Sequence, residues 1–162
     1  MARSQGRGRH RRVRETPAPR YSPGAAPREL TGVVLDSDVI IEILRGHSGV
    51  LKTALDLEES GVPTVCTPIS WAEIFAGVRR GEEAATRAFF EARGELALDG
   101  KIGRRAGDYL ARFTKSHGVE IADALIAAAA ATSGRRLWTL NRKHYPMEDL
   151  QFFEATTKEK RR

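Results

Sequence analysis

Four polar residues interrupt otherwise apolar segments of this 162-residue chain, and their types suit the binding of a hard metal ion. They are Asp36, Glu73, Asp123 and Asn141. Two carboxylates about 4 Å apart repel each other by on the order of 4 kcal/mol at an effective dielectric constant of about 20, so converging acids need protons or a cation. Oxygen ligands without a Cys or His cluster favour Mg²⁺ or Mn²⁺ over zinc. Such a site predicts metal-assisted hydrolysis of a phosphodiester bond by an activated water molecule.

These residues lie in or beside segments that alternate between strand and helix patterns. The spacing of apolar residues and of Gly and Pro predicts strands over residues 31–36, 62–67, 96–98, 136–140 and 150–153, and helices over residues 38–46, 48–60, 70–80, 82–93, 101–116 and 121–132. Alternating strands and helices favour parallel pairing, so the predicted fold class is α/β: a three-layer α/β/α sandwich with a short, mainly parallel sheet. The carboxyl ends of parallel strands meet at one crevice, where Asp36 and Asn141 can approach Glu73 and Asp123.

The charge of the chain is concentrated at its ends. The formal net charge is +6, and residues 1–29 supply this excess through eight Arg against two Glu. This pattern predicts a basic, disordered tail over residues 1–29, one domain over residues 30–157 and a basic C-terminal tail over residues 158–162. The first tail is either a polycation that raises non-specific affinity for RNA or an over-extended start of translation, and the sequence leaves both interpretations open.

Several classes of protein are excluded by composition. The single cysteine, Cys66, excludes an intramolecular disulfide and a Cys-based zinc knuckle, and it fits a reducing compartment. No apolar run approaches the roughly 18 residues that a membrane span needs, and no apolar segment follows the basic pair at 11–12 to complete a twin-arginine signal. We therefore expect a cytoplasmic protein without a membrane partner.

Four blocks of sequence resemble the PIN domain family, and within it the VapC-like ribonuclease toxins of type II toxin–antitoxin modules. The blocks are VLDSDVII at 34–41, TPISWAEI at 67–74 with Gly77, IADALIA at 121–127 and TLNRKHYPM at 139–147. Each block is weak alone, whereas four blocks in this order, covering about residues 33–154, make a specific pattern.

The resemblance implies a site, a reaction and partners. It implies that Asp36, Glu73 and Asp123 bind Mg²⁺, with Mn²⁺ as a possible substitute, and that Asn141 occupies a position where many relatives have Asp. The neutral Asn141 leaves three formal negative charges in place of four. The implied reaction is endonucleolytic cleavage of RNA that leaves a 5′-phosphate and a 3′-hydroxyl. The implied partners are an RNA substrate, a small cognate antitoxin and a second copy of the chain in a homodimer.

Eight further polar residues could assist this site, and each also has a simpler structural interpretation. They are Asp38, Ser70, Thr139, Arg45, Arg79, Arg80, Arg142 and Lys143. Asp38 and Ser70 either support the acids or act as N-caps of the helices that begin near them. Thr139 either orients a water molecule or simply favours a strand. The five cations either bind RNA phosphates or are ordinary surface charges.

Other interpretations of the whole chain stay open at this point. Taken singly, Asp36 could be a helix N-cap, Glu73 a capping-box acid and Asp123 a partner of a helix dipole. A catalytically silent PIN-like module that binds RNA or a partner is the alternative function. Residues 33–38 also resemble the nucleophile strand of haloacid-dehalogenase-type phosphatases, but no later strand–Lys block follows. His117 and His144 could support metal-free cleavage only if both rings converged, which nothing in their spacing requires.

Overall fold

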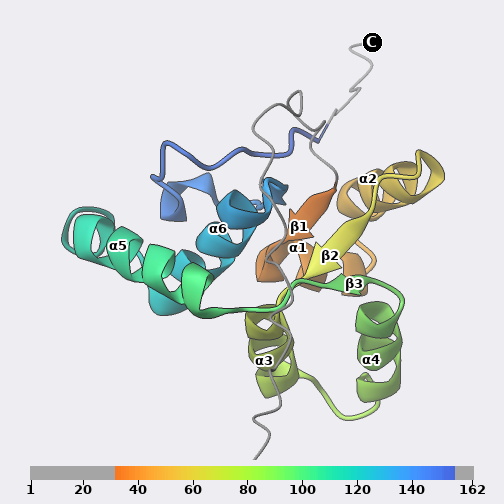
Figure 1. The fold of residues 1–162 in the computed structure, drawn as a ribbon. Helices are drawn as coiled ribbons and strands as arrows, with labels where there is room; N and C mark the ends of the chain where they lie inside the picture. The colour runs from red at the N-terminus through yellow and green to blue at the C-terminus, as the bar shows by residue number, and fades with distance from the viewer. Residues whose placement is uncertain (1–31, 156–162) are drawn as a thin grey trace, which may run out of the picture.

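A computed structural model describes residues 32–155, in which helices cover both faces of a small sheet (Figure 1). In chain order the elements are β1 (Val33–Leu35), α1 (Ser37–Leu44), α2 (Ser48–Glu59), β2 (Thr64–Cys66), α3 (Pro68–Gly77), α4 (Glu83–Glu91), β3 (Gly94–Glu95), α5 (Gly100–His117), α6 (Ile121–Ser133), β4 (Arg136–Trp138) and the 3-10 turn η1 (Arg142–His144). The predicted tails, 1–29 and 158–162, and the predicted domain ends at 30 and 157 lie outside the described residues. Within residues 32–155 no helix is long and apolar enough to cross a membrane.

The four strands are all parallel and lie in the order β3-β2-β1-β4. Alternate residues of β1 point to opposite faces: Val34 joins the core beneath α5 and α6, whereas Val33 and Leu35 join the core on the other face, with α1, α2 and α3. This arrangement confirms the predicted three-layer α/β/α sandwich. The chain crosses to one side of β1 to form β2 and returns to the other side to form β4, so β1 and β4 meet at the point where the strand order reverses.

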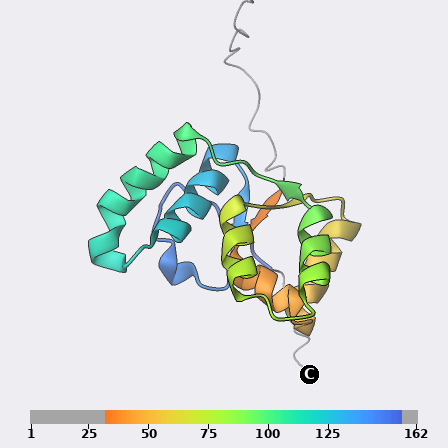
Figure 2. The same cartoon turned by 90° about the horizontal axis from the view of Figure 1, so that it is seen from below.

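Helix α6 has more buried residues than any other helix of the described chain, as its apolar sequence predicts. The four residues 127–130 are all Ala, and each is 0% exposed. Their small side chains suit close packing of α6 against its neighbours, the sheet and α5. Helices α5 and α6 run antiparallel beside each other and are joined at the end of the molecule where α6 begins (Figure 2).

The predicted strands at 31–36, 62–67 and 136–140 are present but shorter than predicted, whereas the other two predicted strands are wrong. The strand predicted at 96–98 is observed at Gly94–Glu95, where Gly94 pairs with Val65 and a Cβ on Gly94 would lie 3.1 Å from Val65 Cγ1. Close approach to β2 therefore places the edge strand on the glycine, and Leu96 and Leu98 pack on the core from the following loop. The strand predicted at 150–153 is reduced to one bridge between Leu137 and Phe152.

A polar network fixes the segment after η1 against α5. Asp149 accepts hydrogen bonds from Arg105 Nη2 at 2.6 Å and from the Tyr109 hydroxyl at 2.8 Å. Burial raises the pKa of the Asp149 carboxyl, but the hydrogen bonds from Arg105 and Tyr109 outweigh burial and hold this pKa below its usual value. The network therefore helps to hold residues 145–150, including the residue that contacts Asp36, in place.

Exposed glycines within α5 should weaken this helix. Gly103 lies in the helix interior, and a Cβ built on it meets no atom within 4 Å. We expect Gly103→Ala to raise the free energy of unfolding by about 0.5–1 kcal/mol, because Ala loses less backbone entropy on helix formation. Gly118, the left-handed C-cap at φ 67°, is the matched control: Gly118→Ala should lower the same quantity by about 1–2 kcal/mol. Urea unfolding measures both, and destabilisation by Gly103→Ala would contradict the prediction.

Candidate metal centre

The candidate site begins at the carboxyl end of β1, where Asp36 caps α1. The Asp36 amide donates to Trp138 O at 2.9 Å, which places this residue beside β4. One carboxylate oxygen accepts from Ser37 N at 2.8 Å, and the other accepts from the Tyr145 hydroxyl at 2.8 Å. Burial, with the charge of Asp36, raises the pKa of Tyr145, so this hydroxyl stays protonated and donates. Asp36 is thus a helix N-cap and also an 8% exposed acid held in one orientation.

Asp38 joins the acid site to the loop after β4. The prediction that it caps the first helix is wrong, because α1 begins one residue before it. Its Oδ2 accepts from Thr139 Oγ1 at 3.2 Å and from Leu140 N at 3.0 Å, and Thr139 Oγ1 accepts in turn from Asn141 N at 3.0 Å. Asp38 Oδ1 is buried and has no hydrogen-bond partner among the described residues. Burial, and secondly the charge of Asp36, raises the pKa of Asp38.

Glu73 approaches the site from α3. This helix begins at Pro68 with Thr67 as its N-cap, so the predicted N-cap at Ser70 and its capping box with Glu73 are wrong. Proline favours the first helical position, and the helix therefore starts directly after β2. Ser70 is buried with its hydroxyl 3.3 Å from that of Thr67, and no contact joins it to the acids in the described structure. Glu73 is exposed, and Ser37 Oγ donates to its Oε2 at 2.5 Å.

Asp123 lies in the first turn of α6, and His144 links it to Asn141. Asp123 Oδ2 accepts from Glu120 N at 3.4 Å and lies 3.7 Å from His144 Nδ1. His144 Nε2 lies 3.0 Å from Asn141 Nδ2, so the ring nitrogen can accept from the amide. Burial raises the pKa of Asp123, and the charge of Asp36 adds to this, whereas the Glu120 amide and His144 oppose it.

The structure brings Asp36, Asp38 and Asp123 into one electrostatic group, with Glu73 attached through Ser37. Within residues 32–155, no Lys or Arg forms an ion pair with any of these four acids. In the same part of the chain, no three His, Cys, Asp or Glu side chains are grouped as ready ligands of one ion. The carboxylates of Asp36, Asp38 and Glu73 accept hydrogen bonds from neighbouring donors. The oxygen donors, the uncompensated negative charge and the unpartnered Asp38 Oδ1 nevertheless fit a hard divalent cation.

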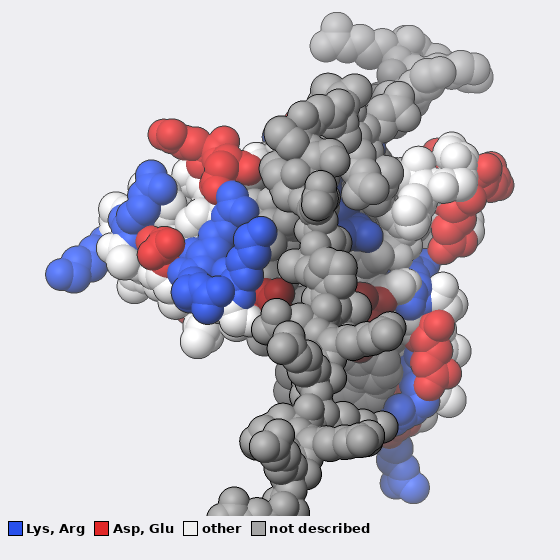
Figure 3. Space-filling model, viewed as in Figure 1, with Lys and Arg blue, Asp and Glu red and all other residues white. Residues whose placement is uncertain are grey.

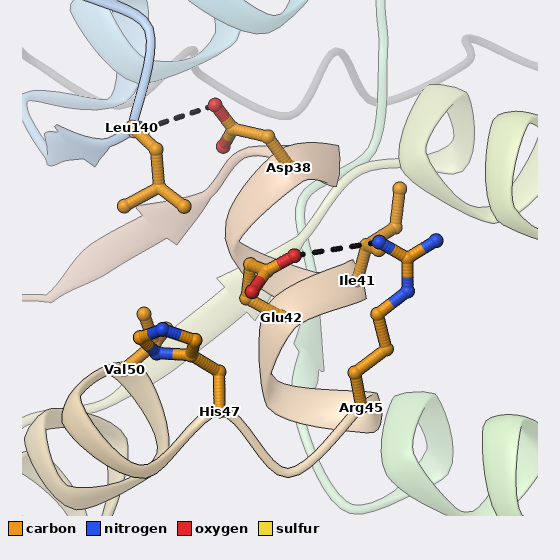
Figure 4. A pocket seen from close by; sticks show the side chains of 7 residues that line it. All are labelled: Asp38, Ile41, Glu42, Arg45, His47, Val50 and Leu140. Carbon is orange, nitrogen blue, oxygen red and sulfur yellow. Dashed lines mark hydrogen bonds and ion pairs between the residues drawn. The ribbon is translucent and has the colours of Figure 1, made fainter.

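Two of the predicted cations border this acid group. Arg45 lines a pocket of about 390 Å³ beside Asp38, where it pairs with Glu42 at 3.4 Å (Figure 4). Arg45 and Arg79 also line a groove of about 460 Å³ between α1, α3 and α4, into which Glu73 opens. Both Arg side chains are therefore available to an anionic ligand that reaches the acids along these surfaces.

The other predicted cations are not brought to the acids. Arg142 pairs with Glu154 at 2.6 Å and lies over the Phe152 ring, with its guanidinium carbon 4.8 Å from the ring centre. Arg80 and Lys143 are exposed, and the described structure records no contact from either to a site acid. Binding of RNA phosphates by these three residues stays a prediction.

Sequence reasoning missed the roles of Ser37, Tyr145 and His144. The sequence around Tyr145 is mostly charged and gives no signal of its burial; once it is buried, its hydroxyl needs a hydrogen-bond partner. Ser37 directly follows an acid at a helix start, a place where its hydroxyl can reach a neighbouring helix. His144 lies three residues after Asn141, and this spacing brings the two side chains together only once the turn η1 forms.

Comparisons with known proteins agree with this architecture. The model of the PIN domain family matches residues 33–149. Two curated relatives from Mycobacterium tuberculosis are Ribonuclease VapC19, 33% identical over 120 residues (73% of this chain, 96% of the relative), and Ribonuclease VapC10, 35% identical over 117 residues (71% and 86%).

Solved structures share the fold at lower sequence identity. The VapBC-1 structure from nontypeable Haemophilus influenzae superposes with a TM-score of 0.64 at 23% identity, covering 76% of this chain and 98% of that chain. The VapBC2 structure from Rickettsia felis, bound to a DNA fragment from its promoter, gives 0.63 at 20% identity, covering 75% and 96%. The match of the family model over residues 33–149, together with the two curated relatives, establishes that the chain belongs to the PIN domain family.

Proposed function

We propose that this protein is a Mg²⁺-dependent endoribonuclease and the toxin of a toxin–antitoxin pair. The observation that carries the proposal is a group of acids that no Lys or Arg of the described residues neutralises: Asp36 at the carboxyl end of β1, Asp38 in α1 and Asp123 in α6. The curated relatives named ribonucleases support the reaction, and the VapBC structures support an antitoxin partner. The alternative, a catalytically silent binding module, gives no reason for these costly acids.

The proposed ligands are Asp36, Glu73 and Asp123, with Asn141 at the fourth position. Mg²⁺ is the expected ion and Mn²⁺ its substitute, since both prefer oxygen ligands. The chemistry that such an ion supplies when bound is activation of water as a nucleophile and neutralisation of charge on the scissile phosphate. The products would be a 5′-phosphate and a 3′-hydroxyl.

Other residues of the chain would orient the acids and the substrate. The Tyr145 hydroxyl holds one oxygen of Asp36, and Thr139 connects Asp38 to the backbone of Asn141. Arg45 and Arg79 lie where they could neutralise phosphates on either side of the cleaved bond. Catalysis would then rest on positioning and charge and would not need a protein nucleophile.

The test is cleavage of total RNA by full-length protein freed of any co-purified antitoxin. Mg²⁺ or Mn²⁺ should produce discrete fragments with 5′-phosphates, and EDTA should abolish them. Asp123→Asn should also abolish them with either metal present, which separates the site from contaminating nucleases. Intact RNA under all conditions, from protein shown to be folded and free of a partner, would favour the silent binding module instead.

A further inference from the structure

Helix α5 presents a row of cations that the candidate metal centre does not use. Its sequence contains five Lys or Arg and a single acid, Asp108. Four of the cations are exposed and, at helical spacing, lie on one face together with Asp108: Lys101, Arg104, Arg112 and Lys115. We call these four residues the α5 basic stripe. Figure 3 shows Lys and Arg side chains gathered over the part of the molecule that α5 occupies.

Helix stability explains only one residue of the α5 basic stripe, Lys115, which lies in the last turn, where a cation is favoured. Within the described residues none of its four cations forms an ion pair, whereas the neighbouring Arg105 pairs with Asp149. Lys101 and Arg104 lie near the helix N-terminus, where the partial positive charge of the backbone disfavours a cation. Arg112 contacts an aromatic ring, with its guanidinium carbon 4.8 Å from the centre of Phe113.

The shape of this face favours a phosphate backbone over a protein partner. The exposed residues beside the stripe are small: Gly103, Gly107 and Ala111. A protein partner needs apolar or aromatic anchors, and this face offers none of the usual kinds. The stripe extends from Lys101 to Lys115, a separation of 14 residue steps or about 21 Å along the helix. A row of point charges of this length suits several successive phosphates.

The position of the stripe relates it to the acids. Helix α5 ends at His117, and α6 begins four residues later with Asp123 in its first turn, so the C-terminal end of the stripe and the acid group lie toward the same end of the α5–α6 pair (Figure 2). A nucleic-acid strand lying along α5 is therefore directed toward the acids.

We propose that the α5 basic stripe binds the phosphate backbone of the RNA substrate and directs the strand toward the candidate metal centre. This inference rests on the proposed function, because it takes RNA as the substrate. The contacts are to phosphates and carry no sequence information, so the stripe contributes affinity and orientation but not the choice of cleavage site.

The test is the salt dependence of binding, measured in EDTA so that no cleavage is needed. The probe is a fluorescein-labelled single-stranded oligouridylate of about 12 nucleotides, and the readout is fluorescence anisotropy with full-length protein. For single strands the slope of log affinity against log salt changes by about 0.7 for each phosphate contact. The pair Arg104→Gln/Arg112→Gln should therefore make the slope shallower by about 1.4 and lower the affinity about 25-fold at 100 mM salt.

The matched control removes two exposed cations from α2 and α4, which lie away from α5. It is Lys52→Gln/Arg87→Gln, in which Arg87 lies over the Phe75 ring much as Arg112 lies over Phe113. This control should leave the slope unchanged, because its charges do not contact the strand. Asp108→Asn should act in the opposite direction and raise the affinity, since it removes the only acid of the row.

The inference would be overturned if the slope of log affinity against log salt became equally shallow in Arg104→Gln/Arg112→Gln and in the control Lys52→Gln/Arg87→Gln. The cations would then act only through the overall charge of the protein. An unchanged slope in the Arg104→Gln/Arg112→Gln pair would also overturn it and would assign RNA binding to other basic segments. Neither result depends on cleavage. Failure of the proposed function appears instead as wild-type protein that leaves RNA intact with Mg²⁺ and Mn²⁺.

Discussion

Asp36→Asn should lower metal-dependent RNA cleavage by about 10³-fold, which corresponds to a loss of about 4 kcal/mol of transition-state stabilisation. Asn keeps the shape of the side chain and serves equally well as an N-cap through its oxygen. Its amide nitrogen takes the place of the second carboxylate oxygen, so it donates to the Tyr145 oxygen and no longer accepts from the hydroxyl. It lacks the negative charge that would hold a divalent cation. The fold should survive, and the metal-free variant should be at least as stable as the metal-free wild type, because repulsion from Asp38 and Asp123 is relieved.

Asp99→Asn is the matched control for this loss. Asp99 is the N-cap of α5 and accepts from Ile102 N at 2.9 Å, so the control makes the same chemical change at a helix cap outside the acid group. It should retain wild-type cleavage of RNA. Initial rates of RNA cleavage test the activity of both variants, and urea unfolding tests whether both are folded. An Asp36→Asn protein with more than about one tenth of wild-type activity would remove Asp36 from the proposed ligands.

The acids were predictable because each breaks a local apolar pattern. Asp36 follows a β-branched run, and Asp123 interrupts the helix that contains the buried Ala run. Parallel pairing then brings the ends of β1 and β4 together, so convergence on one edge follows from the fold class. Strand β3 could not be placed in this way. Both of its residues are exposed, so its position depends on contact with β2 and not on a pattern of its own.

The side-chain contacts that connect the acids could not be predicted from the sequence, for a different reason. Thr139 donates to Asp38 across 101 positions of the chain, and this hydrogen bond depends on the conformation of the loop after β4. His144 reaches both Asp123 and Asn141 only because η1 turns the chain back toward α6. Periodicity describes strands and helices but not such turns, and the side chains that orient the acids come mainly from turns and helix ends.

Divalent metal should stabilise the wild-type protein strongly, independently of any cleavage. A ligand at 100 times its dissociation constant raises the free energy of unfolding by about 2.7 kcal/mol. For a domain of this size, that change corresponds to a rise of about 8–12 °C in the midpoint of thermal unfolding. Saturating Mn²⁺ added to EDTA-treated protein should produce this rise, and Asp36→Asn and Asp123→Asn should lose most of it. An equal rise in the wild type and in both variants would show that the ion binds elsewhere.

Asn141→Asp applies the same thermal-unfolding experiment to residue 141, the proposed fourth position of the metal site. Without metal, a carboxylate at 141 would add repulsion toward Asp123 and remove the N–H that points to His144 Nε2, so the unfolding midpoint should fall. With saturating Mn²⁺ the additional charge becomes a ligand, and the difference between metal-bound and metal-free midpoints should exceed that of the wild type. If the two differences are equal, residue 141 lies outside the coordination shell and Asn141 acts only through His144. A larger difference would mean that the native Asn weakens metal affinity in this chain.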